Sequence, residues 1–93
     1  MIAAYRKNPD VVFRAIAGEF ILVPVRQRAV DLKSVFTLNE TGAFIWGLID
    51  GSRPDSGIEE AVAAAFRVGP DQARQDVAEL LGQLESAGLI SRT

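Results

Sequence analysis

Cysteine and histidine are both absent from the sequence. Without cysteine the chain has no disulfide framework, no thiolate nucleophile and no thiolate ligands for zinc or an iron–sulfur cluster. Without histidine it has no imidazole to act as a general acid or base, which removes the catalytic triads that depend on one. Only carboxylates, lysine, hydroxyl groups or a borrowed cofactor remain for catalysis. We therefore expect a protein that is not an enzyme, with no catalytic residues, no metal and no cofactor.

Long hydrophobic runs are also missing. The longest, such as residues 20–25 and 61–66, are about six residues, against roughly 20 in a membrane-spanning helix. The first ten residues lack the continuous apolar stretch of a secretion signal. We expect a cytoplasmic protein with no membrane partner.

What the sequence does contain is enough apolar residues for one core. The chain has 93 residues, 48% hydrophobic and 24% charged, with a net charge of −2. A chain of this length buries about two thirds of the surface that its unfolded form exposes, which leaves room for a single core. No repeat or low-complexity linker interrupts it. The sequence predicts one domain over residues 1–93, with a flexible tail over residues 1–10.

The first third of the chain has the pattern of β-strands. Residues 11–16 and 20–25 are rich in β-formers and are separated by a short turn. Pro24 has no N–H to donate, which predicts an edge position or a strand end. Residues 34–38 predict a third short strand, with Val35 and Thr37 on one face and Phe36 and Leu38 on the other.

From Asn39 onward the apolar spacing is that of helices. Asn39 is a good N-cap for a first helix, which ends at Asp50 and Gly51. Ser56 and Glu59 have the spacing of a capping box that opens a second helix. Pro70 opens a third and longer helix. Its apolar stripe and the segment that follows Gly88 are expected to pack on the core: Ala73, Val77, Leu80, Leu81, Leu84, Leu89 and Ile90. The order predicts an α+β fold resembling a winged helix-turn-helix, with three short antiparallel strands followed by three helices.

Two features of the helices bear on packing and on metal binding. Gly42 lies inside the first helix, where glycine costs about 1 kcal/mol relative to alanine. We therefore expect it to contact a strand or a neighbouring helix closely. Asp76 and Glu79 are three residues apart and share a face of the third helix, which we interpret as a solvated outer face and not as a metal site.

Charge is distributed unevenly and bears on the partner. Residues 1–33 hold six basic and three acidic residues, whereas residues 34–93 hold four basic and nine acidic residues. Both helices that could enter a DNA groove are acidic, and phosphates would repel them. We expect no nucleic acid partner, although a winged-helix DNA-binding regulator stays open as an alternative.

The strands suggest a different partner. A strand at a sheet margin offers unpaired N–H and C=O groups, and an extended peptide can add itself there as a further strand. The segment from Lys33 to Leu38, beside the third helix, is the natural place. Arg26, Arg28 and Lys33 lie near it and favour an acidic peptide. The same edges could equally pair two copies, so a homodimer also stays open.

Three segments in register resemble the PqqD family. Residues 37–46 read TLNETGAFIW and run into LIDG at 48–51, residues 58–62 read IEEAV, and residues 76–84 read DVAELLGQL before GLI at 88–90. The resemblance covers roughly residues 11 to 91. Members of that family usually carry a proline–glutamate pair before the third strand, where this chain has residues 30–33, VDLK. We therefore favour a PqqD-like recognition element over the quinone-pathway protein itself.

The resemblance implies a function and a site. It implies a non-catalytic protein that binds the leader of a ribosomally synthesised precursor peptide by strand addition and presents it to a modifying enzyme, such as a radical SAM protein. The peptide strand would lie along Lys33, Ser34, Val35, Phe36 and Thr37. The helix contacts would come from Arg74, Val77, Ala78 and Leu81. A structural subunit that docks on an enzyme without touching peptide is the remaining alternative.

Overall fold

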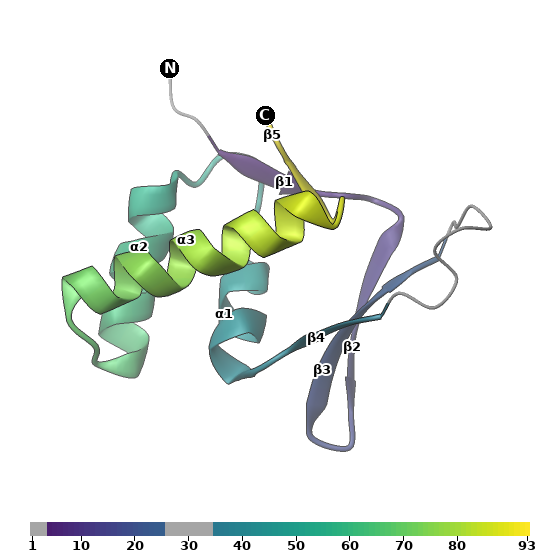
Figure 1. The fold of residues 1–93 in the computed structure, drawn as a ribbon, viewed down its shortest axis with the longest axis horizontal. Helices are drawn as coiled ribbons and strands as arrows, with labels where there is room; N and C mark the ends of the chain where they lie inside the picture. Colours follow the sequence, from purple (N-terminus) through teal and green to yellow (C-terminus); the bar gives the residue numbers. More distant parts are fainter. Residues whose placement is uncertain (1–3, 26–34) are drawn as a thin grey trace.

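The computed structural model describes residues 4–25 and 35–93. In chain order its elements are β1 (Tyr5–Lys7), β2 (Val11–Ile16), β3 (Glu19–Pro24), β4 (Phe36–Leu38), α1 (Glu40–Leu48), α2 (Asp55–Phe66), α3 (Pro70–Ser86) and β5 (Ile90–Arg92). The three helices gather on one side, and the sheet made by β2, β3 and β4 extends beside them (Figure 1). The α+β prediction, with antiparallel strands followed by three helices, is confirmed. None of the described helices is both long enough and apolar enough to cross a membrane.

Two strands are not anticipated by the sequence pattern. β1 and β5 form an antiparallel pair in which Tyr5 lies opposite Arg92. Ala4 and Tyr5 are only 1% and 5% exposed, so the prediction of a flexible tail is wrong for residues 4–10. The segment gives no local signal because its partner strand comes from the other end of the chain. Leu89 and Ile90 do pack on the core, as expected.

The second sheet has the strand order β2-β3-β4, with both pairings antiparallel. Ala17 and Gly18 join β2 to β3 with φ angles of 52° and 81°, the left-handed conformation that a tight hairpin turn requires. Pro24 is the last residue of β3, so the predicted strand end is confirmed. The other option for Pro24, an edge strand, does not apply because β3 is the central strand. β4 is the edge strand that leads into α1.

The predicted helix starts are correct in two of three cases. The Asn39 side chain caps α1, and Pro70 occupies the first turn of α3. The capping box at Ser56 and Glu59 is wrong: α2 begins at Asp55, with Pro54 at the N-cap and no side-chain cap bond. Pro54 is already held extended by a bridge to Ala4, which turns the chain into the helix one residue before Ser56 can cap it.

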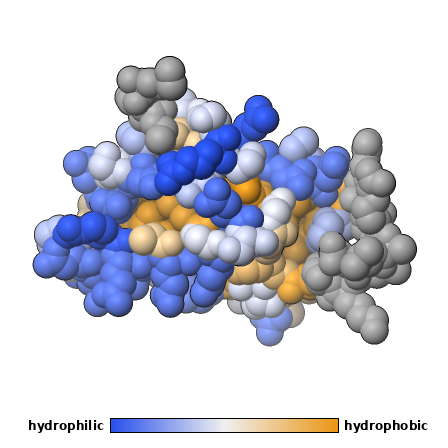
Figure 2. All heavy atoms as spheres, turned by 45° about the horizontal axis from the view of Figure 1, so that its top comes forward, coloured by the Kyte–Doolittle hydropathy of each residue, from blue (hydrophilic) through white to orange (hydrophobic). Residues whose placement is uncertain are grey.

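The core lies where the helices meet the inner face of the β2-β3-β4 sheet. Its largest fully buried side chains come from β3 and all three helices: Leu22, Ile45, Ile58, Val62, Val77 and Leu84. α2 packs along α3, and β4 contacts α1. Figure 2 shows apolar residues in a band across one face, bordered by hydrophilic residues on both sides. Among residues 4–25 and 35–93, four large apolar side chains remain exposed: Phe13, Ile16, Val25 and Val35.

A cluster around Tyr5 ties the two chain ends to the helices. The Tyr5 hydroxyl donates to Glu85 Oε1 at 2.9 Å, which joins β1 to the end of α3. The Arg92 guanidinium lies 4.3 Å from the Tyr5 ring centroid and 3.4 Å from Asp55 Oδ2 at the start of α2. Burial raises the pKa of the Tyr5 phenol above its ordinary value of 10.0, and the hydrogen bond to Glu85 raises it further.

Tyr5 is the only tyrosine, so tyrosinate absorbance reports its ionisation directly. We expect its pKa to lie above 10.0 in the native protein and to return to that value on unfolding in guanidinium. Because the folded state holds the neutral phenol, this contribution to the free energy of unfolding is complete below the unfolded pKa and is lost as the pH rises through the folded one.

The control for this prediction is Tyr5→Phe. It should lower the free energy of unfolding by about 1 kcal/mol at neutral pH through the lost hydrogen bond. Its stability should also fall less steeply than that of the wild type above the unfolded pKa. Identical slopes for the two proteins in that range would show that the raised pKa is not a property of the fold.

Candidate functional site

A pocket of about 220 Å³ lies between the start of α1 and the middle of α3, at the point where β4 ends. β4 has β3 on one side, and within residues 4–25 and 35–93 no strand pairs with its other side. A single residue, Asn39, separates β4 from α1. The structure therefore places an unpaired strand edge and a hollow next to each other.

The α1 wall of the pocket comes from its first two turns: Asn39, Thr41, Gly42 and Ile45. Asn39 Oδ1 accepts a hydrogen bond of 2.7 Å from the Gly42 N–H. A Cβ added at Gly42 would stand 3.1 Å from Leu38 Cδ2 and 3.2 Å from Asn39 Oδ1. The expected close contact of Gly42 with a strand is thereby confirmed, and the contact fixes the angle at which β4 enters α1.

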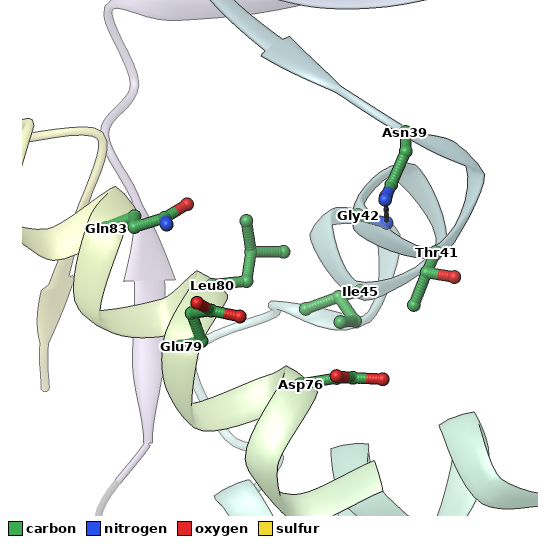
Figure 3. A pocket seen from close by; sticks show the side chains of 8 residues that line it. All are labelled: Asn39, Thr41, Gly42, Ile45, Asp76, Glu79, Leu80 and Gln83. Carbon is green, nitrogen blue, oxygen red and sulfur yellow. Dashed lines mark hydrogen bonds between the residues drawn. The ribbon is translucent and has the colours of Figure 1, made fainter. Parts of the chain in front are cut away.

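The α3 wall comes from residues spaced three and four apart along one stripe: Asp76, Glu79, Leu80 and Gln83. Asp76 extends from α3 toward the α1 wall, and Leu80 and Ile45 supply the apolar surface between the helices (Figure 3). Gln72 Nε2 donates to Asp76 Oδ1 at 2.8 Å. Glu79 is exposed and Asp76 is half-buried, so the face that they share is solvated, as we interpreted it, and it also lines the pocket.

The predicted strand residues fall at or before β4. Lys33 and Ser34 lie outside the described residues. Val35 directly precedes β4 and is 51% exposed, and Phe36 and Thr37 are its first two residues. Thr37 is exposed whereas Phe36 and Leu38 turn inward, so the predicted division of the two faces is confirmed. Contact of these residues with a peptide stays a prediction.

The predicted helix residues are not brought to the pocket. Val77 and Leu81 are 0% and 3% exposed and belong to the core. Arg74 pairs with Asp71 on the exposed side of α3, and Ala78 is also exposed. At about 100° per residue, Arg74 and Ala78 both lie on the opposite side of α3 from Asp76. The signal in the sequence is that Leu80 directly follows Glu79 and lies one helical turn beyond Asp76, which places an apolar residue beside two carboxylates.

Comparisons with known proteins show the family and the fold of the chain. The family model described as Coenzyme PQQ synthesis protein D (PqqD) matches residues 19–90. Among solved structures, TbiB1 in complex with the TbiA(beta) leader peptide has a TM-score of 0.74 and 22% identity, covering 92% of this chain and 94% of that one. Lasso peptide synthetase B1 complexed with the leader peptide has a TM-score of 0.76 and 18% identity, covering 94% and 96%. No curated protein matches the chain significantly in sequence.

The crowding at Gly42 leads to a paired prediction. Gly47, in the same helix, has nothing within 4 Å of an added Cβ. Gly47→Ala should raise the free energy of unfolding by up to about 1 kcal/mol through helix propensity alone. Gly42→Ala should gain nothing or lose stability, because the atoms that it crowds belong to the buried Leu38 and to the N-cap. Urea unfolding of both variants checks this, and an equal gain in the two would contradict the packing described at the β4–α1 junction.

Proposed function

The chain belongs to the PqqD family, and from this premise we propose that it binds the leader segment of a ribosomally synthesised precursor peptide and presents it to a modifying enzyme. The observation that carries the proposal is the unpaired edge of β4 beside the pocket between α1 and α3. Two structures with the same fold are complexes with leader peptides, which supports the same use of the fold here. The protein would take part through recognition, without a catalytic group of its own.

Strand addition accounts for how the peptide is held. β4 has only three residues and a single described neighbour, so it offers backbone N–H and C=O groups along its outer edge. A peptide that pairs with this edge gains main-chain hydrogen bonds whatever its sequence, and specificity comes from the pockets that receive alternate side chains. The pocket beside Asn39 is placed to receive one such side chain.

The partner enzyme follows from the family and not from the geometry. We propose a peptide-modifying enzyme as the partner, because the chain would otherwise hold a peptide without acting on it; a radical SAM protein is one such enzyme that the family resemblance implies. Val25 and Val35, which flank β3 and β4, remain exposed, and so does Ile16 at the hairpin end of β2, which leaves apolar surface for a second protein once the peptide is bound.

A backbone-amide NMR titration tests the proposal. The labelled protein is titrated with a leader peptide from the precursor encoded nearest its gene. We expect shifts at Val35 to Leu38 and along Asp76 to Gln83, with no shifts on adding duplex DNA. A protein that serves only as a docking subunit would give shifts with the neighbouring enzyme and none with the peptide, which would overturn the proposal.

A proline substitution tests strand addition itself. Val35→Pro removes a backbone N–H at the start of the β4 edge, whereas Val35→Ala shortens the same side chain and keeps the N–H. We expect the proline variant to lose clearly more peptide affinity than the alanine variant, by calorimetric titration with both variants folded. Equal losses would contradict pairing of the peptide along this edge.

A second test of strand addition changes the backbone of the peptide instead of that of the protein. Consecutive N–H groups of a paired strand point to opposite sides, so only alternate residues bond β4. An N-methyl scan along the peptide should therefore weaken binding at every second position. A loss without this period would indicate that the peptide binds in another conformation.

A further inference from the structure

The pocket beside β4 is acidic on its α3 side. Asp76 and Glu79 stand one helical turn apart on the wall of a cavity whose remaining α3 residues are Leu80 and Gln83. Asp76 is half-buried, and Glu79 is exposed at the rim. Like charges at this spacing repel each other, and the repulsion persists until an opposite charge lies between them.

Nothing in the described part of the chain supplies that opposite charge. The ion pairs among residues 4–25 and 35–93 join Arg74 to Asp71 and Arg92 to Asp55, away from the pocket. Asp76 receives only a neutral hydrogen bond from Gln72. The N-terminus of α1 contributes about half a positive charge at the opposite wall, but Asn39 already caps it and Glu40 lies in its first turn. Two full negative charges therefore dominate the pocket.

The shape of the cavity suits one long side chain. Its volume of about 220 Å³ is below the range of roughly 300–1,000 Å³ that holds drug-sized molecules. Ile45 and Leu80 line it with apolar surface, and the two carboxylates stand at one side. Lysine and arginine combine an apolar stem with a charged end, so they can bury the stem on the half-buried Leu80 and direct the cation to the carboxylates. An acidic side chain would be repelled, and an apolar one would cover the carboxylates without pairing them.

We propose that this pocket selects a lysine or arginine of the bound peptide, with Asp76 and Glu79 as the residues that determine the preference. The inference rests on the proposed function, since it concerns the side chain of a peptide already paired with β4. The basic residues Arg26, Arg28 and Lys33 led us to expect an acidic peptide. The present inference adds that the one peptide residue that enters this pocket is basic.

The test uses a random twelve-residue peptide library displayed on phage and selected on the whole chain. Three proteins are compared: the wild type, Asp76→Asn/Glu79→Gln, and Glu59→Gln/Glu60→Gln on α2. The two double variants change the net charge equally, but only the first alters the pocket. The amide oxygen introduced at position 76 would still accept the hydrogen bond from Gln72. Selected peptides are then synthesised with lysine or glutamine at the enriched position, and their affinities are measured at low and high salt.

We expect lysine or arginine to be enriched at one position in selections on the wild type and on the α2 variant, and not on the pocket variant. The lysine peptide should bind the wild type about three- to tenfold more tightly than the glutamine peptide, as two partly exposed ion pairs allow. This advantage should shrink in high salt, because the pairs are screened. It should vanish in the pocket variant.

The other outcomes separate the two proposals. Peptides that bind and shift the amides of Phe36 to Leu38, but show no basic preference, would overturn the role of Asp76 and Glu79 and leave the proposed function standing. A basic preference that is lost equally in the α2 variant would assign it to net charge and also overturn that role. Failure to select any peptide that shifts the β4 amides would overturn the proposed function, and this inference with it.

Discussion

The short junction between β4 and α1 is the constraint on which the candidate site depends. Only Asn39 lies between them, and its side chain accepts a hydrogen bond from the Gly42 N–H. Leu38, the last residue of β4, is buried against Gly42, where a larger residue would crowd it. Because the connection is a single residue, the strand edge cannot shift without moving α1. The distance between that edge and α3 is thus set by how α1 packs on α2 and α2 on α3.

Much of the fold is predictable because it follows from neighbours in the sequence. Asn39 and Pro70 act within one turn of their own helices, and the stripe from Ala73 to Leu84 is a local periodicity. The β1–β5 pair is not local: Tyr5 gains its partner only when the two chain ends meet, so no window of sequence contains the signal. The false capping box has the same origin, since the bridge between Ala4 and Pro54 fixes the start of α2 from outside the helix.

The sequence predicts which residues of the strand share a face, but it does not predict which residues of α3 line the pocket. Alternation alone separates Val35 and Thr37 from Phe36 and Leu38, because a strand has only two faces. A helix has a continuous circumference, and which polar stripe lines a pocket depends on how the helix is rotated against its neighbours. α3 turns Val77 and Leu81 into the core and Asp76 and Glu79 toward α1. The core and the pocket thereby use different stripes of one helix, so the residues that line the pocket can be substituted while the core is kept.

The meeting of β1 and β5 also determines how the domain can be joined to other proteins. The Thr93 N–H donates to the Ala4 carbonyl at 2.9 Å, so the two described ends lie side by side. Both point away from the sheet that contains β4 (Figure 1). A host protein could therefore accept the domain as an insertion through a single loop, with little cost in loop closure. The same proximity would permit circular permutation, with the chain reopened at the hairpin turn of Ala17 and Gly18, and the outer edge of β4 would stay unobstructed in either arrangement.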